Sequence, residues 1–227
     1  MKILAIDPGS SLGWATDATG RLEWGTEDFH IKRGESSGNR WRRFGRWLNS
    51  VTTKQTWHPQ LDPTIEATVD LIVYEQAHFM PKARAAAEIA AGFTTRLEEL
   101  CERDFYDPSN GGKQKIALQP VPVQTLKAFA LPRAVRAKRK KCETVQEYRA
   151  RCPITDRSKE AMIRGACNRL LSIAMSEGKR PLPFFSPKFE PSGALVVLES
   201  ESPVAPFLNE HEADALWLYW YAKENCG

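Results

Sequence analysis

The first nine residues constrain the fold of this chain more than any other segment. Residues 3–6 form an apolar run, typical of a strand buried on both faces, and the run ends at Asp7 and a Pro-Gly turn. A second buried strand, predicted over residues 69–74, ends at Glu75 in the same way. Leaving a carboxylate unpaired at the end of a core strand is costly, so we expect both groups to have a partner.

A third acidic segment opens the last predicted helix. Asn209, followed three residues later by Glu212, fits an N-cap with its capping-box partner. Asp214 lies four residues after Glu210 and three after His211, so these three share a helix face. Either Glu210 or His211 is therefore a candidate co-ligand of Asp214. A hard divalent cation can be bound by carboxylates from three distant segments at once, so we expect such a cation to be their partner.

This set of groups predicts a metal-dependent phosphoryl-transfer enzyme. Magnesium binds a few carboxylates and takes its other ligands from water and substrate phosphate. Two such ions can stabilise both the attacking and the leaving oxygen of an in-line displacement. We assign Asp7 as the bridging ligand, with Glu75 and Asp214 completing the site. His211 would bind metal as a neutral imidazole or orient the attacking water, or it is an exposed or locally hydrogen-bonded side chain.

The order of expected elements predicts an α/β fold, a mixed β-sheet flanked by α-helices. Strands are expected at residues 2–6, 12–16, 22–26, 69–74 and 116–121, the second and third as a hairpin, and a short one at 195–198. Helices are expected at about residues 41–51, 83–103, 125–130, 157–176 and 209–225. We expect one domain over residues 1–227, with a basic insertion at about 131–157 and a Pro-rich insertion at about 178–206.

Composition and charge narrow the class of protein. No apolar run is long enough for a transmembrane helix, and the N-terminus does not read as a signal peptide. The five cysteines are scattered without a CxxC pair, which favours reduced thiols in a cytoplasmic protein. Residues 130–169 hold twelve Lys and Arg against four Asp and Glu. This basic segment indicates a polyanion partner or a solvated loop.

Taken in order, several segments resemble the RuvC-like Holliday junction resolvases, which have an RNase H-like fold. The matching motifs are residues 6–9, residues 74–82 with the Ala-rich helix that follows, residues 123–127, residues 158–162 and residues 211–216. The expanded basic and Pro-rich insertions resemble those of phage-type members, some of which cut a wider range of branched DNA.

The resemblance implies a magnesium- or manganese-dependent endonuclease with two ions per active site. It implies a homodimer that resolves four-way DNA junctions by paired phosphodiester hydrolysis, in the cytoplasm of a bacterium or a phage-infected bacterium. The implied metal ligands are Asp7, Glu75, His211 and Asp214, and Lys159 is an implied catalytic residue. The DNA-binding residues that we predict are Phe79, Lys82, Lys127, Lys159, Arg133, Arg136, Lys138, Arg139, Lys140 and Lys141, where Phe79 would stack on bases.

Three other functions stay open from the sequence. A nuclease of the same fold could act on other branched DNA or on RNA–DNA hybrids, and a non-catalytic protein could bind junctions with the same basic segment. Sugar kinases and actin-like ATPases also carry an early Asp-x-Gly strand and turn. The chain shows no second such phosphate loop and is short for the paired domains of those enzymes, so we expect a nuclease.

Overall fold

A computed structural model of the protein describes residues 1–56, 64–76, 84–109, 111–131, 144, 146–147, 154–176, 188–189, 195–196 and 208–226. Its centre is a five-stranded sheet with the order β3-β2-β1-β6-β9. The strands are β1 (Ile3–Asp7), β2 (Ser11–Thr16), β3 (Glu23–Asp28), β6 (Leu71–Gln76) and β9 (Ala117–Pro122).

The directions of these strands identify the fold class. β1, β2 and β3 form an antiparallel meander, whereas β6 pairs parallel to β1 and β9 pairs parallel to β6. In this sheet β2 therefore runs antiparallel to the other four strands. The predicted mixed α/β sheet is therefore confirmed, and each of its five strands lies within a few residues of the predicted position.

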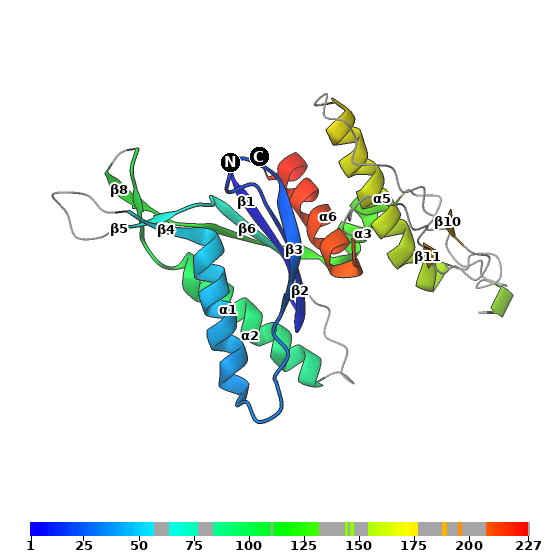
Figure 1. The fold of residues 1–227 in the computed structure, drawn as a ribbon, viewed down its shortest axis with the longest axis horizontal. Helices are drawn as coiled ribbons and strands as arrows, with labels where there is room; N and C mark the ends of the chain where they lie inside the picture. The colour runs from blue at the N-terminus through cyan, green and yellow to red at the C-terminus, as the bar shows by residue number, and fades with distance from the viewer. Residues whose placement is uncertain are drawn as a thin grey trace, which may run out of the picture.

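Helices cover both faces of this sheet (Figure 1). One face packs against α1 (Ser37–Thr52) and α2 (Arg84–Cys101), and the other packs against α6 (Glu210–Asn225). Beside α6 lie α3 (Val123–Ala130) and α5 (Ile154–Ser176). These five helices were expected from the sequence, with ends that differ by a few residues.

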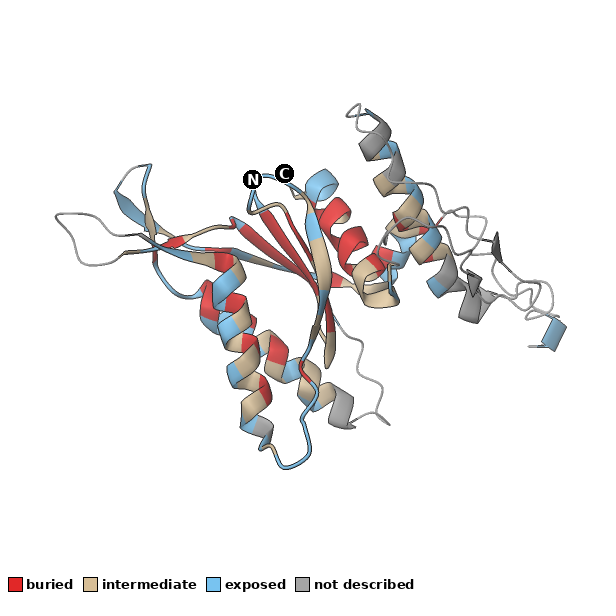
Figure 2. Ribbon diagram, viewed as in Figure 1, coloured by how far each residue is buried: buried red, intermediate tan, exposed pale blue. Residues whose placement is uncertain are grey.

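The apolar run at the start of the chain is explained by these two layers. Ile3 and Ala5 belong to the core under α6, whereas Leu4 and Ile6 belong to the core under α1 and α2. All four side chains are fully buried, and Figure 2 shows the central strands buried between the helices. Because alternate residues of a strand point to opposite faces, only a continuous apolar sequence suits this position.

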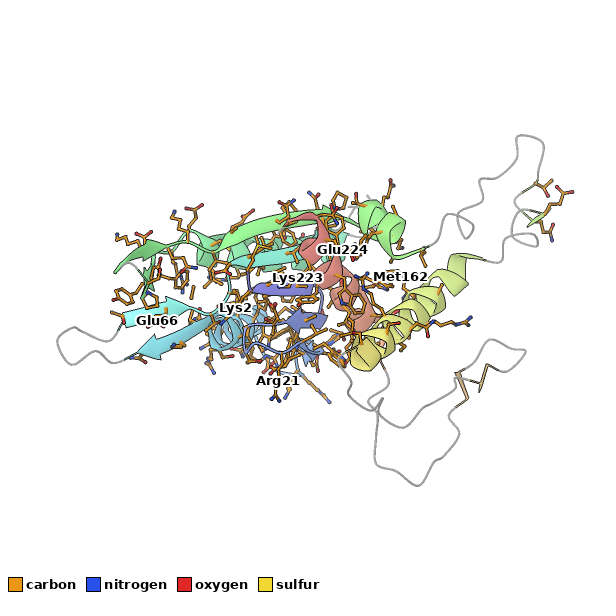
Figure 3. The ribbon with its side chains drawn as sticks, turned by 90° about the horizontal axis from the view of Figure 1, so that it is seen from above. Lys2, Arg21, Glu66, Met162, Lys223 and Glu224 are labelled. Atoms are coloured by element: carbon orange, nitrogen blue, oxygen red, sulfur yellow. The ribbon has the colours of Figure 1, made fainter. Side chains whose placement is uncertain are left out.

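The aromatic side chains of α1 contribute to the core under this helix. The Phe44 ring is fully buried and meets the Phe93 ring of α2 edge-on, with 4.7 Å between the ring centroids. On the other face, Trp217 of α6 donates a hydrogen bond of 2.9 Å from its indole nitrogen to the backbone oxygen of Met162 on α5. Met162 is labelled in Figure 3, where α5 lies alongside α6.

The structure also contains a sheet that the sequence reasoning missed. Its four strands have the order β4-β5-β7-β8, namely β4 (Thr53–Thr56), β5 (Thr64–Ala67), β7 (Phe105–Asp107) and β8 (Gly112–Gln114). Within this sheet, β7 and β8 pair antiparallel, with Asp107 opposite Gly112.

Most of the two predicted insertions lies outside the described residues. Within the Pro-rich range, β10 (Lys188–Phe189) pairs with β11 (Leu195–Val196), at the place where a short strand was expected. Across the described parts of the chain, no helix is long and apolar enough to span a membrane. The expectation of a single domain stays a prediction.

Candidate active site

Two of the predicted acidic residues lie side by side at the ends of β1 and β6, two neighbouring strands inside the central sheet. Ile6 of β1 pairs with Tyr74 of the parallel strand β6, and Asp7 and Glu75 each follow one residue later. They share the strand parity of Ala5 and Val73, which pack under α6. The alternation of side chains therefore places both carboxylates on the face of the sheet that α6 covers.

The first turn of α6 brings the third acidic group to this face. The predicted capping box is confirmed: the side chain of Asn209 accepts a hydrogen bond of 2.9 Å from the backbone N–H of Glu212, and the Glu212 carboxylate accepts one of 3.0 Å from the backbone N–H of Asn209. Asn209 also donates to the hydroxyl of Thr26 on β3 at 2.7 Å. This contact fixes the start of α6 on the sheet, with Asp214 in its second turn.

The far end of α6 is anchored as well. The ammonium group of Lys223, labelled in Figure 3, lies 2.6 Å from the carboxylate of Asp17. That carboxylate also accepts a hydrogen bond of 2.7 Å from the backbone N–H of Ile3 at the start of β1. Although burial opposes it, the hydrogen bonds and charge of Lys223 hold the pKa of Asp17 below its ordinary value. Anchors at both ends give α6 one position on the sheet.

Gly13 of β2 allows the close approach of α6, and sequence reasoning missed this residue. Gly13 pairs with Asp7 across β1 and β2. A Cβ atom at this position would lie 1.9 Å from the backbone oxygen of His211, well inside van der Waals contact. A glycine in the middle of a predicted strand was the available signal, because such a glycine often marks the close approach of another backbone.

His211 faces the carboxylate of Asp7. Its Nδ1 atom lies 2.8 Å from Oδ2 of Asp7, although the two residues are 204 positions apart. The hydrogen bond and the negative charge of Asp7 raise the pKa of His211, partly offset by burial. Its Nε2 atom lies 3.8 Å from a carboxylate oxygen of Glu210. The structure therefore places His211, rather than Glu210, against the predicted bridging ligand.

Glu210 has a different partner. Its carboxylate forms an ion pair with Lys159 of α5. The pair raises the pKa of Lys159 and lowers the pKa of Glu210, as expected when each charged group stabilises the other. The negative charges of Asp214 and Asp7 also act on Lys159. Lys159 thus lies close to the acidic group and is held there by Glu210, which was expected from the sequence as a candidate metal ligand.

The carboxylates of Glu75 and Asp214 are perturbed most strongly. Burial, followed by the charges of Asp7 and Asp214, raises the pKa of Glu75 to about 8. Burial and the charge of Asp7 raise the pKa of Asp214 to about 7. The positive charge of Lys127 opposes both shifts, so Lys127 also lies near the group. The positive charge of Lys127 is therefore too small to offset burial and mutual repulsion, so Glu75 and Asp214 are not fully ionised near neutral pH.

The donor set fits a divalent cation, although the side chains are not arranged around one. Among the described residues, no group of three or more His, Cys, Asp or Glu side chains is gathered closely enough to hold a metal ion. The pKa values of Glu75 and Asp214 are nevertheless raised by burial and by neighbouring carboxylates, which a bound cation would offset, and oxygen ligands of this kind suit Mg²⁺ and Mn²⁺. Metal binding would require side chains to move from their present positions.

The structure brings together six of the predicted site residues, namely Asp7, Glu75, Lys127, Lys159, His211 and Asp214. The other predicted DNA-binding residues lie outside the described part of the chain: Phe79, Lys82, Arg133, Arg136, Lys138, Arg139, Lys140 and Lys141. Their roles stay predictions.

Comparisons with known proteins give similar structures but no sequence family. No family model matches the chain, and no curated protein matches it. A structure of Thermus thermophilus RuvC in complex with a Holliday junction substrate has a TM-score of 0.48 and 13% identity, covering 99% of this chain and 96% of that chain. A further Thermus thermophilus RuvC structure has a TM-score of 0.44 and 15% identity, with the same coverage of both chains. At these values, functional conclusions depend on the residues of the site itself.

Proposed function

We propose that this protein is a divalent-metal-dependent endonuclease of the RuvC-like type, which resolves four-way DNA junctions by paired phosphodiester hydrolysis. The observation that supports this most is the meeting of three carboxylates from distant segments, Asp7 of β1, Glu75 of β6 and Asp214 of α6, whose charges act on one another. Such mutual repulsion is unfavourable in a protein that only binds phosphates, whereas it suits a metal-dependent hydrolase.

In the proposed reaction, Asp7, Glu75 and Asp214 would hold two Mg²⁺ or Mn²⁺ ions. When bound, such ions lower the pKa of a water molecule and offset the negative charge that develops on the phosphate oxygens. The protein's own cations prepare the approach of DNA: Lys127 and Lys159 are exposed beside the carboxylates and attract the backbone. Release of Lys159 from Glu210 would direct its ammonium group to a phosphate.

His211 has a position suited to proton transfer. Its Nδ1 atom is engaged by Asp7, which fixes the ring orientation. Among the described residues, its Nε2 atom has the more distant carboxylate of Glu210 as its partner, and the side chain is one-third exposed, so this atom would be able to exchange a proton with water or with an oxygen of the DNA. If the ring instead turns to bind a metal ion, His211 would do so in its neutral form.

Cleavage of a labelled four-way junction tests the activity. The substrate is incubated with Mg²⁺ or Mn²⁺, beside a linear duplex and an RNA–DNA hybrid of the same sequence. We expect paired nicks near the branch point. Cleavage of the hybrid alone would assign the same active site to a hybrid nuclease, and junction binding without cleavage in either metal would overturn the proposal in favour of a binding protein.

Two variants connect the activity to the carboxylates. Asp7→Asn should abolish cleavage and weaken Mn²⁺ binding, measured by calorimetry without DNA. Asp104→Asn is the matched control, because this exposed carboxylate pairs with Lys113 on the second sheet, away from the acidic group. Equal Mn²⁺ affinity in the two variants would argue against the proposed metal ligands.

Paired cuts need two active sites, so we also propose a homodimer. Light scattering of the purified protein, alone and with a junction, measures this. A monomer in the junction complex would contradict the proposed pairing of cuts.

A further inference from the structure

A second basic site lies on the other side of the central sheet. A cavity of about 290 Å³ lies between α1 and the end of α2. Four arginines line it, Arg42 and Arg46 from α1, Arg96 from α2 and Arg103 just after α2, and Glu99 is the only acidic residue among the lining residues. We call this cavity the arginine groove. Its lining carries a net charge of +3.

Among the described residues, only one of these four arginines forms an ion pair with a carboxylate. Arg96 forms an ion pair of 2.6 Å with Glu99. Arg42 donates a hydrogen bond to the side chain of Asn39, and Arg103 donates one of 3.5 Å to Asn49, so both have neutral partners. In the described part of the chain, Arg42, Arg46 and Arg103 form no ion pair with an acidic residue. Three guanidinium groups are thus available to an anion.

The arrangement is unfavourable for the protein alone. Arg42 and Arg46 are four residues apart on α1, where like charges repel and destabilise a helix. Arg103 adds another positive charge from the opposite wall of the groove. An anionic ligand would relieve this repulsion, and the planar fork of a guanidinium group matches a phosphate in particular.

The position of the groove separates it from the candidate active site. α1 and α2 pack on the face that carries Leu4 and Ile6, whereas the acidic group lies on the face under α6 (Figure 1). The groove therefore cannot contact the phosphate that is cleaved. A second copy of this chain is an unfavourable occupant of the groove, because a symmetric contact would bring two sets of arginines together.

We propose that the arginine groove binds the phosphate backbone of a DNA arm that is not being cut. This inference rests on the proposed function, since a branched substrate has arms beyond the one in the active site. An arm held here adds phosphate contacts that a short linear duplex in the active site cannot make. The groove would therefore contribute to the preference for branched DNA.

The test is DNA binding without metal, so it does not depend on cleavage. The variant Arg42→Gln/Arg46→Gln/Arg103→Gln removes three charges from the groove. The matched control, Arg21→Gln/Lys32→Gln/Arg33→Gln, removes three exposed charges that lie elsewhere. Fluorescence anisotropy with EDTA gives the Kd of a labelled four-way junction, and of a linear duplex, over a series of salt concentrations.

We expect the groove variant to reduce the slope of log K against log salt for the junction by about 2 to 3, since each lost phosphate contact accounts for about 0.9. Its affinity for the junction should fall about 100-fold at about 0.1 M salt. Its affinity for the linear duplex should change less than about threefold, and the control variant should keep the wild-type slope.

Glu99→Gln provides the opposite test. It removes the only acidic lining residue, so the junction should bind more tightly and with a steeper salt dependence. This variant also keeps the proposal testable if the triple variant does not fold. Wild-type slopes in both variants would overturn the inference, as would an equal loss of affinity for junction and duplex. A change in oligomeric state by analytical ultracentrifugation would assign the groove to a second copy and overturn it too.

These outcomes are distinct from those that test the proposed function. Loss of junction cleavage in Asp7→Asn with unchanged metal-free binding concerns the acidic group only. A changed salt slope in the groove variant concerns the groove only, whether or not the wild type cleaves DNA.

Discussion

The carboxyl group of Glu75 should make the metal-free protein less stable as the pH rises. Burial and the charges of Asp7 and Asp214 raise its pKa from an ordinary value of 4.5 to about 8 in the folded chain. Below pH 4.5, Glu75 is protonated in both the folded and the unfolded chain, so it does not change the free energy of unfolding. Between the two values the unfolded chain ionises first, and the free energy of unfolding falls until the folded carboxyl has ionised as well.

The size of this effect follows from the two pKa values. A difference of one pKa unit corresponds to about 1.4 kcal/mol, so the full difference for Glu75 sets an upper limit of about 5 kcal/mol. Asp214 shares the same repulsion, so the two carboxyls titrate as a coupled group and their contributions do not add. Allowing for partial solvent exposure, we expect the free energy of unfolding to fall by about 2–3 kcal/mol between about pH 5.5 and pH 8.5.

Urea unfolding in EDTA at several pH values measures this loss. Glu75→Gln cannot ionise and should remove most of it, whereas Glu98→Gln, an exposed change on α2, should not. Some dependence should remain in Glu75→Gln because of His211. The pKa of His211 is raised by Asp7, so its stabilising effect is complete below the ordinary pKa and is lost as the pH rises through the raised value.

Metal provides the second half of this experiment. Mg²⁺ or Mn²⁺ should restore the stability of the wild type at high pH, because an ion that binds only the folded chain stabilises it by mass action. The same ions should have little effect on Glu75→Gln. If the free energy of unfolding depends on pH equally in the wild type and in Glu75→Gln, the reasoning is refuted. The pKa of Glu75 would then not be raised in the folded chain.

Three further changes have direct expectations. Gly13→Ala should displace α6 and lower the Tm by about 5–10 °C in thermal unfolding, whereas Gly45→Ala, with open space at its Cβ, should not lower it. Asn209→Ala removes the N-cap of α6 and should cost about 1 kcal/mol in urea unfolding, and a change below about 0.3 kcal/mol would contradict the role of the cap. Glu210→Gln frees Lys159 and should tighten DNA binding about threefold or more in anisotropy, and weaker binding would argue against this role.

The central sheet could be predicted because its sequence requirements are strict. A strand buried on both faces needs a continuous apolar run, and Ile3 to Ile6 meets this requirement directly. The carboxylates at the ends of two such runs, together with the capping box at Asn209, indicated which segments would meet. The helices could be predicted for a similar reason, because their buried side chains recur at helical spacing, as in α1.

The second sheet could not be predicted because its strands lack such a pattern. β4 and β8 have the sequences Thr-Lys-Gln-Thr and Gly-Lys-Gln, which are short and polar. Each pairs with its hairpin neighbour, and the two hairpins join where β5 pairs with β7, which is distant in the chain. The ion pair between Lys159 and Glu210 was missed for a related reason. Surface lysines are frequent, and only the packing of α5 on α6 identifies the partner.

The contact between Asp7 and His211 has a consequence for the synthesis of this protein. It joins residues 204 positions apart, so the acidic group is assembled only when α6 packs on β1 and β2. A nascent chain that has not yet emerged beyond about residue 209 has the first two carboxylates but lacks Asp214 and His211. Contacts of such long range also form late in folding, because a large loop must close first. Ribosome-bound and truncated chains would thus carry the strands of the proposed nuclease without its complete active site.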